Sequence, residues 1–272
     1  MSLFISSINS GSNGNCYYIG NSSDAVLIDV GLSCREIEKR MLRSGLSIQN
    51  VRAIFISHEH IDHIRGVEVL SKKYDLPVYI NEKTLANLRI KLKKKLVRSF
   101  SDAELIAVES LQVIPFFKSH DAADPYSFSV THDGIRIGVF TDIGTVCEKL
   151  TDHFSQCHAA FLEANYDDEM LENGRYPIFL KNRIRGSHGH LSNAQALSLF
   201  MEHKSESLSL LFLAHLSKEN NSPELVENLF SAQSGPIKIV VASRYEESAV
   251  YKIGHSGLEE GSILRGQFAL EI

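Results

Sequence analysis

The chain has 272 residues, of which 43% are hydrophobic, and its 28 lysine and arginine residues against 33 aspartate and glutamate residues give a formal net charge of −5. This composition is ordinary for a globular protein with a sizeable core, and we expect one domain that spans residues 1–272. The acidic balance excludes a nucleic-acid-binding footprint spread over the whole surface, so any such footprint must be local.

The cysteines and the apolar runs indicate the compartment. The cysteines are Cys16, Cys34, Cys147 and Cys157. They form no C-x-x-C pair and no dense framework, so we expect reduced or buried thiols. No signal peptide opens the chain, and no apolar run reaches the roughly 18 residues of a membrane span. The sequence therefore predicts a cytoplasmic protein that contacts no membrane.

Apolar runs alternate with amphipathic segments in the first hundred residues. Expected strands cover residues 4–8, 16–19, 25–31, 51–56 and 78–80, and expected helices cover 35–43, 67–74 and 82–97. The Gly-, Ser- and Asn-rich segment 9–15 is expected to join the first two strands in a hairpin, with a phosphate cradle of its backbone amides as an open alternative. The alternation of strands and helices indicates an α/β layer fold.

Three histidines and a carboxylate lie within six residues directly after the expected strand 51–56. His58 and His60 are two residues apart, so an extended backbone sends both side chains to one side. A helix that begins near Asp62 places this carboxylate and His63 in its first turn. Nitrogen and oxygen ligands in this mixture favour zinc, and manganese or iron would satisfy the same set.

A basic run covers residues 89–98, with six positive charges and no negative one in ten residues. We expect it on the long helix 82–97. Its central lysines are candidate contacts for a nucleic-acid backbone. These are Lys91, Lys93, Lys94 and Lys95. The alternative is a helix face that is simply solvated, because most charge runs are of that kind.

The rest of the chain continues the alternation. Expected strands cover 111–117, 126–131, 135–140, 158–165, 208–213 and 237–241, and expected helices cover 167–171, 178–185, a segment that begins at Ser192 or Asn193, and 222–230. Asp133-Gly134 between two apolar runs predicts a tight hairpin. Residues 243–272 contain no motif that we can interpret.

Further polar residues stand at strand ends. His120, Asp142 and His215 each follow an expected strand, and Asp29 lies within the strand 25–31, which is apolar up to this residue. An unpaired carboxylate in a buried strand is costly, so we expect a histidine or a metal ion beside Asp29.

The pattern His-x-His-x-Asp-His after a strand resembles the hallmark of the metallo-β-lactamase superfamily, and His60 favours its hydrolytic branch because the flavodiiron branch has Glu there. The resemblance implies a four-layer αββα sandwich that holds two divalent metal ions. It assigns His58, His60 and His120 to one ion, Asp62, His63 and His215 to the other, Asp142 to both as a bridge, and Asp29 to the orientation of ligands.

Segments 163–165, 189–196 and 213–215 are similar to three segments of tRNase Z, a member of the same superfamily in which a glutamate and a histidine form a proton-transfer pair. By that resemblance Glu163 and His190 deliver a proton to the leaving group while a metal-bridging hydroxide attacks. Together with Asp62 they are the expected catalytic residues. The alternative is that His190 only caps the helix that follows it.

Segments 10–15, 120–122, 162–165 and 189–193 are similar to the YycJ (WalJ) group of the superfamily, which is associated with 5′ to 3′ exonuclease action on double-stranded DNA. The likeness implies a phosphodiesterase acting on nucleic acid, with DNA favoured. A small-molecule hydrolase of the same fold stays open, such as a cyclic phosphodiesterase, a thioesterase or a lactonase. The complete ligand set argues against a non-catalytic binding protein. The residues indicate no oligomeric state.

Overall fold

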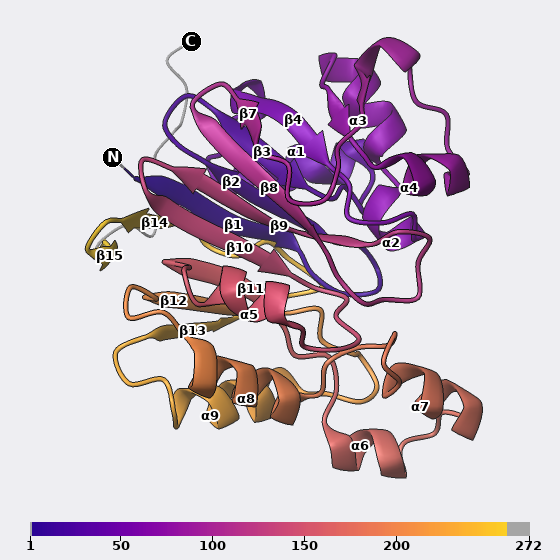
Figure 1. Cartoon of the computed structure of the whole chain (residues 1–272), viewed down its shortest axis with the longest axis vertical. Coiled ribbons are helices and arrows are strands. Elements are labelled where there is room, and N and C mark those ends of the chain that lie inside the picture. Colours follow the sequence, from indigo (N-terminus) through magenta and orange to yellow (C-terminus); the bar gives the residue numbers. More distant parts are fainter. Residues whose placement is uncertain (1, 260–272) are drawn as a thin grey trace.

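Two β-sheets pack face to face at the centre of the structure, a computed structural model that describes residues 2–259, and helices cover both outer faces (Figure 1). The order of strands is β15-β14-β1-β2-β3-β4-β5-β6 in the first sheet and β13-β12-β11-β10-β9-β8-β7 in the second. These layers confirm the predicted αββα sandwich. The predicted single domain also includes residues 260–272, which lie outside the described residues.

The strands and helices have the following bounds. The first sheet contains β1 (Leu3–Asn9), β2 (Cys16–Gly20), β3 (Ala25–Ile28), β4 (Val51–Phe55), β5 (Val78–Tyr79), β6 (Val97–Arg98), β14 (Tyr251–Gly254) and β15 (Gly257–Leu258). The second contains β7 (Ile106–Val108), β8 (Leu111–Phe117), β9 (Tyr126–His132), β10 (Ile135–Phe140), β11 (Ala159–Glu163), β12 (Leu210–Ala214) and β13 (Lys238–Val241). The α-helices are α1 (Cys34–Arg43), α2 (Ile61–Ile64), α3 (Val67–Tyr74), α4 (Glu82–Asn87), α5 (Glu148–Phe154), α6 (Asp168–Asn173), α7 (Ile178–Ile184), α8 (Asn193–His203) and α9 (Pro223–Ser231).

Three apolar layers hold the sandwich together. The central layer lies between the sheets, where Tyr17 of β2 contacts Phe161 of β11 and Phe161 stacks on Phe212 of β12. A second layer packs α1 and α3 against the first sheet, and a third packs α5, α8 and α9 against the second sheet. Strands with helices on one face and a sheet on the other are buried on both sides, which explains their nearly unbroken apolar runs. No helix within residues 2–259 is long and apolar enough to cross a membrane.

Local signals placed most elements correctly. Ser33 accepts a hydrogen bond at the start of α1, and Ser192 forms a capping box with Gln195 at the start of α8. Asp133 and Gly134 both have positive φ angles, 47° and 77°, as the tight turn between β9 and β10 requires. Those hairpin and cap predictions are confirmed.

The prediction of one long helix over residues 82–97 is wrong. Helix α4 ends at Asn87, because Leu88 takes an extended conformation with ψ of 136°. The chain then bends at Arg89 and Ile90 and continues without helix to a short 3₁₀ turn (Lys94–Leu96) and β6. Leu88, Ile90 and Leu92 alternate with exposed residues and pack against the apolar layer of the first sheet. This period of two favours extended backbone, and tertiary packing decided against the helical propensity of the lysines.

The segment without an interpretable motif completes the first sheet. Strand β14 pairs antiparallel with β1, with Leu3 opposite Ile253 and Ile5 opposite Tyr251. Strands β6 and β7 and helix α5 were also not predicted from the sequence. Strand β14 is only four residues long, so its alternation was too brief to separate from a loop.

Candidate metal centre

Six strands and helix α2 bring the predicted site residues to one edge of the sandwich. Strands β3 and β4 are parallel, as are β10, β11 and β12, so within each set the carboxyl ends meet at the same edge. Six of the predicted site residues lie just beyond the carboxyl ends of β3, β4, β8, β10 and β12. They are Asp29, His58, His60, His120, Asp142 and His215. Glu163 is the last residue of β11. Asp62 and His63 lie in α2, which begins directly after His60.

Three of these residues adopt left-handed backbone angles at the point where their strand ends. The φ angles are 60° for Asp29, 56° for Asp142 and 55° for His215. Such angles cost about 1–3 kcal/mol each in a residue other than glycine, so surrounding bonds must hold them. The Asp29 amide donates to the Phe55 carbonyl at 2.8 Å, and the His215 amide donates to Ser10 Oγ at 2.8 Å. Two of the three residues, Asp142 and His215, belong to the candidate ligand groups.

The side chains form four overlapping groups with the spacing of metal ligands in the described residues. His58, His60 and His120 make one ligand group, and Asp62, His63 and His215 make a second. The other two contain Asp142, either with His58 and His63 or with Glu163, His190 and His215. His58 Nε2 lies 3.1 Å from His60 Nδ1, and Asp62 Oδ2 lies 3.7 Å from His63 Nε2. Two ligand atoms that each lie about 2.0–2.1 Å from the same tetrahedral metal ion are about 3.3 Å apart. The first two groups are those assigned from the sequence.

Asp142 lies between the two groups. Its Oδ2 is 3.4 Å from His63 Nε2, and its Oδ1 is 3.9 Å from His120 Nε2. Asp142 Oδ2, His120 Nε2 and His215 Nε2 are buried atoms with no hydrogen-bond partner in residues 2–259. A buried polar atom without a partner is costly, and three such atoms around one point are explained by cations that they would bind. The residues therefore fit divalent metal ions, and their assignment as ligands stays a prediction.

The ring nitrogens that face away from the centre are held by hydrogen bonds. His63 Nδ1 lies 2.7 Å from Asp29 Oδ2, and His120 Nδ1 lies 3.1 Å from the Gly189 carbonyl. Asp29 also accepts hydrogen bonds from the backbone and side chain of Ser57, whose Oγ is 2.9 Å from His58 Nδ1. Bonds of this kind orient the rings of metal-binding histidines. Asp29 has the histidine neighbour that its burial led us to expect.

Burial and charge act in opposite directions on these groups. Burial lowers the pKa of His120 to about 4 and holds the pKa of His58 well below its usual range, so both rings stay neutral at pH 7. Burial by itself raises the pKa of Asp142, but the neighbouring His215 and His63 outweigh it and keep this carboxyl ionised. Neutral imidazoles and an ionised carboxylate are the forms that bind a metal. Burial by itself lowers the pKa of His63 and His215, but the neighbouring Asp142 carboxylate outweighs it and raises the pKa of both rings, so these two histidines would release a proton when a metal binds.

Glu163 and His190 form a close pair beside this centre. His190 Nδ1 lies 2.7 Å from Glu163 Oε1, and Oε2 accepts hydrogen bonds from the backbone amides of Ile143 and Leu191. Burial alone would raise the pKa of Glu163, but the charge and hydrogen bond of His190 and the hydrogen bond of His215 lower it to about 2. A Cβ at Gly189 would lie 2.0 Å from the Ile184 carbonyl oxygen, so glycine is required in the approach to His190.

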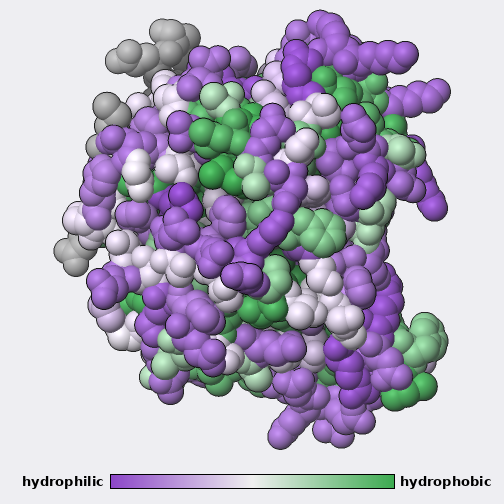
Figure 2. Space-filling view, viewed as in Figure 1, coloured by the Kyte–Doolittle hydropathy of each residue, from purple (hydrophilic) through white to green (hydrophobic). Residues whose placement is uncertain are grey.

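A hollow of about 190 Å³ opens beside His190 and His215. Tyr176, Leu180 and Arg183, from α7 and the segment before it, line one side. Arg183 Nη2 lies 2.5 Å from Asp121 Oδ2, which ties α7 to the residue after His120. The space-filling view shows a hydrophobic patch at the lower right, over α7, whose exposed apolar residues are Ile178 and Phe179 (Figure 2).

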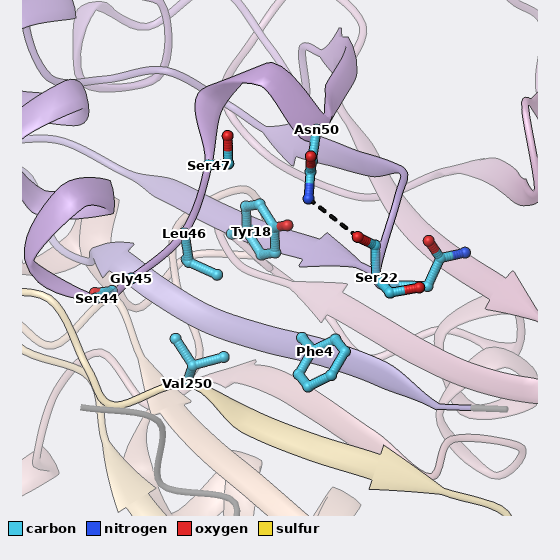
Figure 3. Close-up of a pocket in the computed structure, with 10 residues that line it drawn as sticks. Phe4, Tyr18, Ser22, Ser44, Gly45, Leu46, Ser47, Asn50 and Val250 are labelled. Carbon is cyan, nitrogen blue, oxygen red and sulfur yellow. Dashed lines mark hydrogen bonds between the residues drawn. The ribbon is translucent and has the colours of Figure 1, made fainter. Parts of the chain in front are cut away.

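A separate hollow of about 130 Å³ lies elsewhere on the protein, beside the end of α1 (Figure 3). Its wall is apolar and includes Phe4, Tyr18, Leu46 and Val250, and its rim carries a hydrogen bond from Asn50 to the Ser22 carbonyl. None of the predicted site residues lines it.

Several residues at the centre were not predicted from the sequence. Asn15 Nδ2 lies 3.1 Å from His63 Nε2 and 3.4 Å from Asp62 Oδ2. Lys118 is 2% exposed, and its amine donates to the Thr141 carbonyl at 2.6 Å. Asparagine and lysine have no spacing rule that marks such roles, because their positions depend on the fold.

The basic run contributes no residue to either ligand group. Lys91, Lys93, Lys94 and Lys95 are exposed and belong to neither group. Lys95 pairs with Asp75 at 2.9 Å, and Lys93 reaches the same carboxylate at 4.0 Å. Their contact with nucleic acid stays a prediction.

Comparison with known proteins adds a family and a fold. The family model described as the metallo-beta-lactamase superfamily matches residues 10–146. Exodeoxyribonuclease YycJ of Bacillus anthracis is 36% identical over 230 residues, which cover 83% of this chain and 86% of the relative. Exodeoxyribonuclease WalJ of Streptococcus pneumoniae is 34% identical over 221 residues, which cover 79% of this chain and 82% of the relative.

Solved structures share the architecture at low sequence identity. The metallo-beta-lactamase fold protein YhfI from Bacillus subtilis has a TM-score of 0.71 and 13% identity, and the match covers 93% of this chain and all of that one. The short form of human tRNase Z has a TM-score of 0.61 and 15% identity, with 90% and 98% covered. These likenesses show the fold.

We expect the purified protein to hold about two divalent ions per chain, because two groups of ligand atoms adjoin the Asp142 carboxylate. Asp29→Asn should keep every predicted ligand but lower metal affinity about 10- to 100-fold, because the Asp29 carboxylate that orients the His63 ring loses its charge. Elemental analysis and chelator competition measure both quantities.

Asp152→Asn, at an exposed position of α5, is the matched control and should leave affinity unchanged. A stoichiometry near zero for the wild type after metal loading would contradict the site, and equal affinity of Asp29→Asn and wild type would contradict the role of Asp29.

Proposed function

The chain belongs to the metallo-β-lactamase superfamily and is a hydrolase of that superfamily, and on this premise we propose that it is a two-metal phosphodiesterase that cleaves nucleic acid, acting on DNA as an exonuclease. The observation that carries the proposal is the Glu163–His190 pair beside the two ligand groups. Such a pair serves the release of a poor leaving group, which the alcohol oxygen of a phosphodiester is. The two relatives named exodeoxyribonuclease support DNA as the substrate.

The ligand groups prepare the attack. Two divalent ions, when bound, would supply an activated water and offset the negative charge of the phosphodiester. His58, His60 and His120 would hold one, Asp62, His63 and His215 the other, and Asp142 would contact both. Asp29 and Ser57 keep the rings of His58 and His63 in place, so the ligand atoms need little reorganisation.

The Glu163–His190 pair supplies the proton. Glu163 is fully buried and fixed by two backbone amides, and its low pKa keeps it charged at neutral pH. The Glu163 carboxylate accepts the Nδ1–H of His190 and so fixes the orientation of the ring. The proton on the other ring nitrogen then passes to the leaving oxygen as its bond to phosphorus breaks. Afterwards the neutral ring takes a proton from water and the cycle repeats.

The mouth of the site supports a polymeric substrate. Arg183 lines the hollow, and the N–H groups that it does not use for its pair with Asp121 suit a phosphate group. Phe179 in the same helix is 72% exposed, and exposed aromatic rings beside a cleft serve as stacking surfaces for bases. The basic run at residues 89–98 adds unpaired lysines, since Lys91 and Lys94 make no ion pair in the described part of the chain.

The substrate is tested by incubating the metal-loaded protein with end-labelled duplex DNA, single-stranded DNA, RNA and bis(p-nitrophenyl) phosphate. We expect DNA to be degraded from an end with release of mononucleotides. The catalytically impaired Asp142→Asn protein is the control for contaminating nucleases. Hydrolysis of the nitrophenyl ester without cleavage of any nucleic acid would favour a small-molecule phosphodiesterase instead.

His190→Ala should keep the metal content but lose roughly 10²- to 10⁴-fold in the rate of DNA cleavage, the range of general acid catalysis. The loss should be much smaller on bis(p-nitrophenyl) phosphate, whose nitrophenolate leaves without a proton. Steady-state rates on both substrates measure the difference. An equal loss on the two substrates would mean that His190 binds the phosphate rather than protonating the leaving group.

A variant in which Gln replaces four lysines of the basic run, Lys91, Lys93, Lys94 and Lys95, should bind duplex DNA more weakly. The slope of log affinity against log salt concentration should also fall, by about one unit for each phosphate contact that is lost. Lys91 and Lys94 should account for most of the change, because Asp75 already neutralises part of the charge of the other two. Binding measured at several salt concentrations tests this. Identical slopes for the variant and the wild type would identify the run as a solvated surface.

A further inference from the structure

A second hollow, of about 250 Å³, lies next to the one that contains His190. The segment after β12 separates the two, and Ser217 lines both of them. The end of β13 and the segment after it, from Val241 to Tyr245, also line this hollow. His215 of the metal centre is only three residues from Lys218, so their Cα atoms lie at most about 11 Å apart. A strand that is bound at the metal centre therefore reaches this hollow within about three nucleotide steps of 3.4 Å.

Two cations without acidic partners line the second hollow. Lys218 is exposed, and neither it nor Arg244 forms an ion pair within residues 2–259. Arg244 is held in place, because Nη2 donates to the Leu216 carbonyl at 2.6 Å and its backbone carbonyl accepts a bond from Asn13. A Cβ at Gly11 would lie 2.9 Å from Arg244 Nη2, so the glycine leaves room for the guanidinium. The other guanidinium N–H groups have no partner in the described residues and are available to an anion.

The same hollow has an apolar floor and an exposed aromatic side chain. Leu216, Val241, Ala242 and Pro223 contribute apolar groups. Tyr245 is 71% exposed, and its backbone rather than its ring makes the hydrogen bonds, to Ser243 and Arg40. A free aromatic ring, an apolar surface and two unpaired cations together match a nucleotide, which offers a flat base and an anionic phosphate.

We propose that the hollow between residues 216–218 and 241–245 is a nucleotide subsite, which binds a nucleotide adjacent to the scissile phosphodiester. The base stacks against Tyr245 and the apolar floor, and the phosphate is bound by Lys218 and Arg244. The subsite rests on the proposed function, because it extends the same strand from the metal centre. It explains how a chain with net charge −5 holds a polyanion close to its catalytic edge.

The test compares substrates that do and do not reach the subsite. In the double variant Lys218→Ala/Tyr245→Ala, kcat/KM for a short DNA oligonucleotide should fall roughly 10- to 100-fold, mainly through KM, as expected for a lost stacking and charge contact. Hydrolysis of bis(p-nitrophenyl) phosphate should be unchanged. Both residues are exposed or at the rim, and unchanged metal content and urea midpoint establish that the variant is folded.

Leu42→Ala/Lys72→Ala is the matched control, since it removes an equally exposed apolar group and lysine from α1 and α3. This control variant should leave kcat/KM unchanged for both substrates. Arg244→Lys keeps the charge but loses the forked donors, so an intermediate increase in KM for the oligonucleotide is expected.

Three results would overturn the subsite. They are an unchanged KM for the oligonucleotide in the double variant, an equal loss on both substrates, and an equal loss in the control variant. Failure of the proposed function looks different, because the wild type itself would then cleave no nucleic acid. In that case, competition by dTMP against bis(p-nitrophenyl) phosphate tests the hollow as a site for a free mononucleotide. Equal inhibition of the wild type and the double variant by dTMP would show that the hollow does not bind a free mononucleotide either.

Discussion

The buried carboxylate of Asp142 is the constraint on which the catalytic edge depends. It is 2% exposed and ionised, and an ionised group removed from water must be balanced nearby. His63 and His215 face it from two sides, and the buried amine of Lys118 adds a third positive neighbour. An Oδ2 atom without a hydrogen-bond partner shows that this balance is incomplete among the described side chains alone. Divalent cations would complete it.

The fold meets this constraint through rigid supports placed outside the centre. Apolar layers on both faces of each sheet bury the strands, and their stability offsets the left-handed angles of Asp29, Asp142 and His215. Close backbone contact fixes the start of α2, since a Cβ at Gly31 would lie 1.7 Å from the Asp62 carbonyl oxygen. Preorganised ligands of this kind lose little entropy on binding a metal or a transition state.

The two sheets contribute different chemistry to one cleft. The first sheet and α2 carry His58, His60, Asp62 and His63, whereas the second sheet carries His120, Asp142, Glu163 and His215. Ligands from both sheets meet in each group, so the site exists only when the sheets are packed. The Glu163–His190 pair and most residues that line the two hollows beside it belong to the second half of the chain.

The sequence by itself determined the layered fold, most strands and helices, and the set of side chains that meet at the metal centre. These depend on local signals: apolar runs, caps such as Ser192, the Asp133-Gly134 turn, and the His58 to His63 spacing, which resembles a known family. Tertiary structure alone decided that α4 ends at Asn87, that β14 pairs with β1, and that the buried Lys118 donates to the Thr141 carbonyl next to Asp142. The physical reason is that these outcomes depend on packing partners distant in the chain, which no local pattern encodes.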